Sequence, residues 1–194
     1  MQKLTREDLM GLEQYAVARE DFRSKVLDHK RNRRIDLGAN AALYFEDRLT
    51  MQYQVQEMLR IERIFEAGGI DEELNAYNPL IPDGSNWKAT FMVEFPDENE
   101  RRTMLQRLVG IEEKVYLQID DGKRIFPIAD EDLERSSAEK TSAVHFLRFE
   151  LSADEASALK QGATLAAGID HDNYNVEKHP VGDSIRQSLV ADLD

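Results

Sequence analysis

The hydrophobic periodicity of this chain changes near Lys88, and the change limits the folds that the chain can adopt. Before that point, apolar residues recur at helical spacing, most clearly from Thr50 to Phe65. After it, apolar and polar residues alternate as they do in strands, in the segments ATFMVEF, EKVYLQI, KRIFPIA, AVHFLRFEL and TLAAGID. Two helical segments, DENERRTMLQRL and SADEASALKQG, interrupt these runs. The pattern predicts an α+β fold, with a mostly antiparallel sheet, helices packed on one face and a helical N-terminal third.

The 194 residues fit a single domain that can bury a substantial core. We expect a helical part at about 1–75, a sheet-rich part at about 88–174 and a loosely held tail at 175–194. The segment RIDLGANAALYFED predicts two short strands with a turn at Gly38. Asp120-Asp121-Gly122 predicts a hairpin between the segments EKVYLQI and KRIFPIA.

Composition excludes several classes of function. The chain has no Cys, which rules out disulfides, thiolate metal sites and iron–sulfur ligation by this protein. With 25 Lys and Arg against 38 Asp and Glu, the net charge is −13, which opposes nucleic-acid binding. The charged N-terminal stretch and the absence of a long apolar run argue against a signal peptide and a membrane span. We therefore expect a cytoplasmic protein with no cofactor, no nucleic-acid partner and no membrane partner.

Charge is unevenly distributed. Between Arg19 and Arg34, seven basic residues stand against three acidic ones, and between Asp120 and Glu139 the same numbers are reversed. The simpler interpretation is two solvated faces, since exposed charges contribute little singly. The two patches could also attract each other, within one molecule or between two copies.

Glu62 is the main candidate for a functional side chain. At helical spacing it falls among Met51, Val55, Leu59 and Phe65, where an apolar residue is expected. A carboxylate in that place needs a partner that neutralises it. A buried arginine such as Arg148 or Arg124 is a commoner partner than a substrate or a metal ion. An acid/base or ligand-binding role is the alternative, as is an oligomer interface along this helix. The ligand-binding candidates around it are Gln54, Glu57, Arg60, Glu62, Asn78, His145 and Arg148.

A metal site is not expected from the histidine pattern. None of the four histidines has His-x-His or Glu-x-x-His spacing. The consecutive residues Asp170, His171 and Asp172 could bind a divalent cation, but neighbours on a strand point to opposite faces. A polar turn at a strand end is the favoured interpretation. Phosphate-binding glycine loops and a nucleophile elbow are absent from the sequence.

The chain resembles an uncharacterised bacterial family, domain of unknown function 3501. The resemblance is carried by KLTREDL, YFEDRLTMQYQVQEMLRIERIF, ELNAYNPLIPDG, LVGIEEKVYLQI, KTSAVHFLRFEL and GIDHDNY, and it runs from about Lys3 to about Tyr174. It brings no catalytic residues with it. It implies that the gene lies beside genes for rubrerythrin-like and iron–sulfur oxidoreductase-like proteins, and hence that the protein has an accessory role in peroxide or redox defence. Asp172 stands where the resemblance leads us to expect proline.

Two functions remain open at this point. The first is a non-enzymatic cytoplasmic binding or accessory protein, a homodimer that supports an iron-containing or iron–sulfur redox partner. The second is a small metal-dependent or acid/base enzyme centred on Glu62. We favour the first, because no catalytic motif is present.

Overall fold

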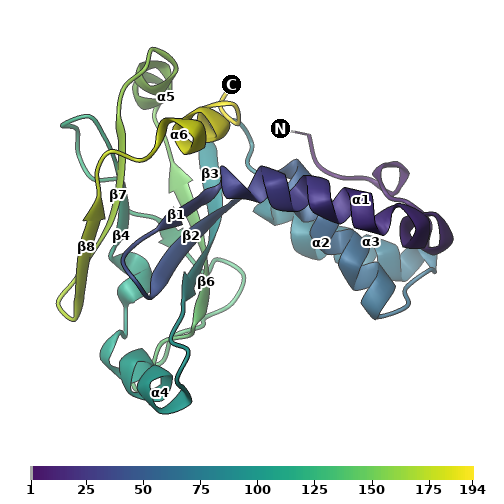
Figure 1. Ribbon diagram of the computed structural model, residues 1–194, viewed down its shortest axis with the longest axis horizontal. Coiled ribbons are helices and arrows are strands. Elements are labelled where there is room, and N and C mark those ends of the chain that lie inside the picture. The colour runs from purple at the N-terminus through teal and green to yellow at the C-terminus, as the bar shows by residue number, and fades with distance from the viewer. Residues whose placement is uncertain (1) are drawn as a thin grey trace.

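The computed structural model describes residues 2–194, and its N-terminal helices form an arm beside two sheets (Figure 1). The arm consists of α1 (Leu12–Arg31), α2 (Arg48–Ile61) and α3 (Ala67–Tyr77), flanked by the 3-10 turns Arg6–Asp8 and Asn78–Leu80. It has a small hydrophobic core of its own, made by Leu4, Met51, Val55, Leu59, Leu74 and Ile81. The apolar spacing that predicted a helix near Thr50 therefore packs α2 against its neighbours in the arm.

A five-stranded antiparallel sheet adjoins this arm. Its order is β1-β2-β3-β6-β5, and its strands are β1 (Arg34–Asp36), β2 (Ala41–Glu46), β3 (Asn86–Val93), β5 (Ile128–Ala129) and β6 (Val144–Glu150). Gly38, with φ +77°, lies in the turn between β1 and β2, a conformation that glycine adopts without strain. In the register of β3 and β6, Phe91 faces His145 and Trp87 faces Phe149.

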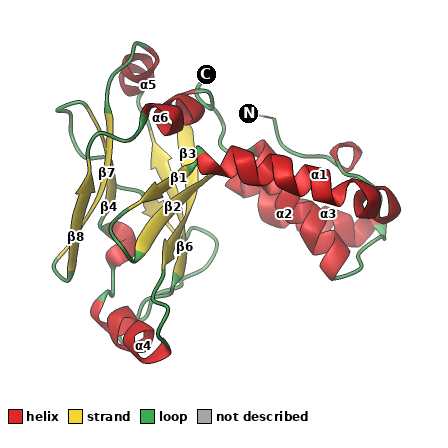
Figure 2. Ribbon diagram, in the orientation of Figure 1, coloured by secondary structure: helices red, strands yellow, loops and turns green. Residues whose placement is uncertain are grey.

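A second antiparallel sheet packs on the inner face of the first (Figure 2). Its order is β4-β7-β8, and its strands are β4 (Val115–Ile119), β7 (Leu165–His171) and β8 (Tyr174–Lys178). Phe91 and Phe149 from one sheet share a core with Leu117 and Ile169 from the other. The predicted α+β class is confirmed, but the strands divide between two sheets. Alternation identifies strands without saying which sheet each one joins.

The remaining helices are α4 (Glu98–Arg107), α5 (Ala153–Lys160) and α6 (Asp183–Val190), and η3 (Ile111–Glu113) is a 3-10 turn before β4. The predicted capping box of α5 is present: the Ser152 N–H donates to Glu155 Oε2 at 2.7 Å, and the Glu155 N–H donates to Ser152 Oγ at 3.3 Å. In residues 2–194, no helix combines the length and apolar character that crossing a membrane requires.

The segment KRIFPIA departs from the predicted hairpin. Only Ile128–Ala129 forms a strand, and it pairs with β6, whereas β4 pairs with β7. A single bridge between Leu117 and Ile125 is what remains of the expected pairing. Pro127 has no N–H to donate, so this segment cannot form a continuous ladder.

The C-terminal tail is packed, which corrects the expectation that 175–194 is loosely held. Val181, Leu189 and Leu193 are buried in the main core. The indole N–H of Trp87 donates to the carbonyl of Leu189 at 2.8 Å. Asp192 is 5% exposed and is bound to Arg33. The tail therefore closes one end of the sheets.

Candidate functional site

Glu62 is exposed, which corrects the expectation of a buried carboxylate on α2. The helix ends at Ile61, and Arg63 adopts a left-handed conformation with φ +56°, so Glu62 is the residue that caps α2. Ile61 and Phe65 are 56% and 74% exposed, so the apolar arc does not extend around Glu62. The proposed ion pair with Arg148 or Arg124 is absent from the described chain. The main argument for a functional centre at Glu62 is thereby removed.

The buried charged side chain where the helical arm meets the five-stranded sheet is that of Arg33, not that of Glu62. Its side chain is 2% exposed and donates to the carbonyls of Phe45 and Glu46 at 3.0 and 3.1 Å. It also binds the carboxylate of Asp192 and lies 3.5 Å from that of Asp47. The basic stretch from Arg19 to Arg34 was predicted to be a solvated face. Arg33 departs from that prediction, because its side chain is buried.

The other candidates on the arm make local contacts. Glu57 accepts hydrogen bonds from Arg19 and Tyr15 and pairs with Arg60. These bonds, chiefly those from Arg19, lower the pKa of Glu57 to about 2. Asn78 exchanges two hydrogen bonds with the backbone of Leu4. Gln54 is half-buried on α2.

The Asp170-His171-Asp172 segment does not converge on one point. Asp170 pairs with Arg124 at 2.6 Å, whereas His171 Nε2 donates to the carbonyl of Val109 at 3.2 Å. Asp172 is exposed in the turn between β7 and β8. These side chains diverge because consecutive residues of a strand point to opposite faces of the sheet.

His145, by contrast, lies in a buried cluster of polar groups. On β6 it is in phase with Leu147 and Phe149, so its side chain enters the core, where it is 0% exposed beside the ring of Phe91. An imidazole in such surroundings requires polar partners. His145 is therefore the one predicted ligand-binding candidate that the fold places in an enclosed site.

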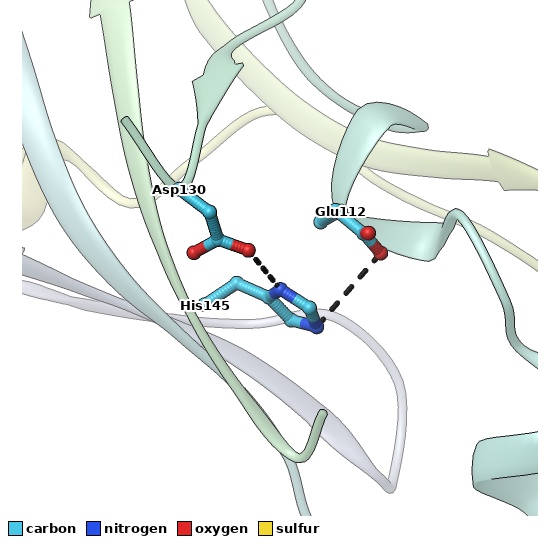
Figure 3. Close-up of side chains that lie close together, drawn as sticks. All are labelled: Glu112, Asp130 and His145. Carbon is cyan, nitrogen blue, oxygen red and sulfur yellow. Dashed lines mark hydrogen bonds and ion pairs between the residues drawn. The ribbon is translucent and has the colours of Figure 1, made fainter. Parts of the chain in front are cut away.

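Two carboxylates approach the His145 ring from opposite sides (Figure 3). Asp130, which follows β5, lies 2.6 Å from Nδ1 through Oδ2. Its other oxygen accepts the Phe146 N–H at 2.9 Å, so the Asp130 side chain is held to β6 at both oxygens. Glu112, from η3, lies 3.8 Å from Nε2 through Oε2. One donor atom from each of these three side chains lies within 4.8 Å of the other two.

Hydroxyl groups complete the cluster. Thr141 Oγ1 lies 2.9 Å from His145 Nε2 and donates to Glu112 Oε2 at 3.2 Å. Ser136 Oγ donates to Glu112 Oε1 and lies 2.9 Å from Thr141 Oγ1. The carbonyl of Ser142 accepts from Nε2 at 3.1 Å. These contacts form a hydrogen-bond path from Asp130 through the imidazole to Ser136.

A cavity of about 380 Å³ opens beside this cluster. Its acidic lining residues are Glu112, Glu113, Asp130 and Glu134. Arg135 is the basic lining residue. It donates hydrogen bonds to Asp132, and these bonds lower the pKa of the Asp132 carboxyl to about 2. Carboxylates therefore dominate the charge of the cavity. His145 lies behind the wall and does not line the cavity in the described chain.

The sequence pattern did not single out Glu112, Asp130, Ser136 or Thr141 as site residues. Asp130 and Ser136 lie in the acidic stretch that predicted a solvated face, and Glu112 lies between helix α4 and strand β4. The available signal was the alternation in AVHFLRFEL, which places His145 on the same side as Leu147 and Phe149. A buried histidine on a strand predicts polar partners without identifying them.

The fold and the site define an α+β protein with two packed antiparallel sheets, a helical arm and a buried His–carboxylate cluster. The family model described as "Protein of unknown function (DUF3501)" matches residues 3–193, so the chain belongs to this family. A similar crystal structure, that of a "novel protein of unknown function" from Burkholderia pseudomallei, shares 49% sequence identity, and all of each chain is covered at a TM-score of 0.94. No curated protein matches the chain.

Proposed function

We propose that this protein binds a divalent cation at Glu112 and His145, with Asp130 supporting the imidazole. The observation that carries the proposal is the approach of these three donors to within 4.8 Å at the wall of an acidic cavity. In this arrangement Glu112 and His145 Nε2 are the direct ligands, and the ion replaces the proton that Nε2 donates to the carbonyl of Ser142. Asp130 orients the imidazole through Nδ1, as a carboxylate commonly does for a metal-binding histidine.

The separation of the direct ligands suits a single ion. Nε2 and Glu112 Oε2 are 3.8 Å apart. Two ligands that each lie about 2.1 Å from one ion are separated by roughly 3 to 4 Å. Thr141 Oγ1 lies between them and would either join the ligand set or give way to the ion.

The chemistry of the donors selects a class of ion. A mixed set of carboxylate and imidazole favours Zn²⁺, Mn²⁺ or Fe²⁺ over Mg²⁺ and Ca²⁺, which prefer oxygen alone. The acidic cavity would raise the local concentration of any cation.

Burial of the imidazole favours a binding role over an enzymatic one. A general base must come within hydrogen-bond reach of the proton that it removes. His145 is 0% exposed, and a substrate in the cavity would meet the carboxylates and Ser136 first. A small cation can enter where a substrate cannot. We therefore propose a non-enzymatic binding protein, as the absence of a catalytic motif led us to expect.

Calorimetric titration of metal-stripped protein with Zn²⁺, Mn²⁺ and Mg²⁺ tests this function. We expect about one Zn²⁺ or Mn²⁺ per chain, weak or no Mg²⁺ binding, and at least about 10-fold weaker binding by Glu112→Gln. Asp172→Asn is the matched control, because it removes a carboxylate outside the cluster. Equal binding by Glu112→Gln, or no binding by the wild-type protein, would refute the proposal; circular dichroism checks that each variant is folded.

The partner and cellular location are separate proposals. We propose a cytoplasmic accessory role beside an iron-containing redox protein, and self-association as a homodimer. The exposed Val17 and Phe65 on the arm, at 89% and 74% exposure, support a contact surface there. Sedimentation equilibrium tests the dimer: a single monomer mass at high concentration counts against it.

Co-purification from the native host at low salt tests the partner, and recovery of no iron protein counts against it.

A further inference from the structure

A second cavity, of about 620 Å³, lies between the arm and the outer face of the five-stranded sheet. Its lining residues include Tyr77, Pro79 and Leu80 from the arm, and Lys88, Phe146 and Arg148 from β3 and β6. Its volume is within the range of small-molecule sites in proteins. This cavity is distinct from the cation site, because the alternation of β6 turns Phe146 and Arg148 away from the His145 side.

Lys88 supplies a cation that forms no ion pair with a carboxylate of the described chain. Its ammonium group donates to the carbonyl of Pro79, and in residues 2–194 no carboxylate oxygen lies within 4.0 Å of it. Burial lowers the pKa of Lys88, although the negative charge of Asp83 opposes this effect. An amine in this position gains from an anion that enters the cavity.

Two carboxylates line the cavity, and each is bound by an arginine: Glu131 by Arg148 and Asp132 by Arg135. Arg148 binds Glu131 through two hydrogen bonds of 2.7 and 2.6 Å, and it also pairs with Glu150. Glu46 faces Lys88 from β2, but its Oε1 accepts from Thr90 at 2.7 Å and its Oε2 has no partner in the described chain. Lys88 is therefore the charged lining residue that forms no ion pair in the described chain.

The walls around Lys88 are largely apolar. Tyr77 and Leu80 line the cavity from the arm, and Phe146 lines it from the sheet. These surfaces gain free energy when an apolar group covers them. A ligand that satisfies both the walls and Lys88 has an apolar body and one anionic end.

We infer that this cavity binds a small carboxylate with an aliphatic or aromatic body, whose carboxylate pairs with the ammonium of Lys88. Ligands of this class combine both features, as fatty acids of short chain length do. The site is independent of the proposed cation centre, so either proposal can fail without the other.

The test is calorimetric titration of metal-stripped protein with hexanoate, and with hexylamine and hexanol as probes of the same chain length. We expect hexanoate to bind, hexanol to bind more weakly and hexylamine not to bind. Lys88→Met should weaken hexanoate binding at least about 10-fold, since it removes the ion pair and keeps the length of the side chain. Lys88→Arg should retain binding to within a few-fold, because it keeps the charge.

Lys178→Met is the matched control, because Lys178 is an exposed lysine on β8, outside this cavity. It should leave the affinity unchanged. Thermal melts confirm that each variant is folded. No hexanoate binding at millimolar concentration, or equal binding by Lys88→Met and the wild-type protein, would overturn the inference. Equal binding of hexanol and hexanoate would overturn it as well, since the carboxylate would then contribute nothing.

Discussion

Replacement of Arg33 by Met should destabilise the fold strongly. Arg33 follows α1 at the entry to β1, and its guanidinium reaches the end of β2 and the C-terminal tail. The variant loses the ion pair with Asp192 and the hydrogen bonds to the carbonyls of Phe45 and Glu46. Methionine fills much of the volume and satisfies none of these groups.

The magnitude follows from the burial of the pair. Arg33 and Asp192 have exposed side-chain fractions of 2% and 5%, and breaking such a pair costs about 3–5 kcal/mol because a buried charge is left alone. A domain has about 5–15 kcal/mol of total stability, so this is a large fraction of it. For a chain of this length, Tm should fall by about 6–20 °C.

Urea unfolding followed by circular dichroism measures this loss. Asp192→Asn is the control: it keeps the Arg33 bonds to Phe45 and Glu46, and should cost about 1–3 kcal/mol. The double variant should lose less than the sum of the single losses, because Asp192 no longer leaves an unpaired charge. A loss below about 1 kcal/mol for Arg33→Met would refute the reasoning.

The loss should also depend on pH. Burial raises the pKa of Asp192 even with Arg33 in place, and removal of Arg33 raises it further. The raised pKa means that the charged carboxylate is the costly form, so the deficit is largest at pH values above the raised folded-state pKa of Asp192 in the variant. It should shrink as pH falls from 7 to about 4, because protonation removes the unpaired charge.

Three other substitutions give distinct expectations. Glu57→Gln should cost roughly 1–3 kcal/mol at pH 7 by urea unfolding. Because Arg19 and other donors lower the pKa of Glu57 from 4.5 to about 2, this difference should decline as pH falls through that interval, and a constant difference would contradict it. Glu62→Gln should change stability by less than about 0.5 kcal/mol in thermal melts, and a larger loss would restore the idea of a buried partner. Gly168→Ala should cost about 1–3 kcal/mol, since the added Cβ would overlap the ring of Tyr116; unchanged urea unfolding would show that the ring moves freely.

Local patterns predicted local structure well. Alternation located β3, β6 and β7, and the Ser152–Glu155 capping box located the start of α5, because neighbouring residues determine these features. Pairing between distant strands is not a local property, so the sheet partition and the partner of β5 could not be read from periodicity. Pro127 was the available warning against a long strand there.

The functional site was predicted less well, for a related reason. The helical pattern predicted a helix from Thr50 to Phe65, but α2 ends at Ile61, and Ile61 and Phe65 are themselves exposed, so the buried side of the helix does not reach Glu62. His145 was identified, whereas its partners Glu112 and Asp130 come from separate segments and meet it only in the fold. Distances in space, rather than spacing along the chain, define this cluster.

Anomalous diffraction from crystals soaked in Mn²⁺ or Zn²⁺ tests the proposed cation centre most directly. We predict an anomalous peak at about 2.0–2.2 Å from Glu112 Oε2 and His145 Nε2, with Asp130 still bound to Nδ1. Peaks confined to surface carboxylates, with the hydrogen bonds from Thr141 and Ser136 to Glu112 intact, would contradict the account. In that case the cluster would serve to hold η3, β5 and β6 together.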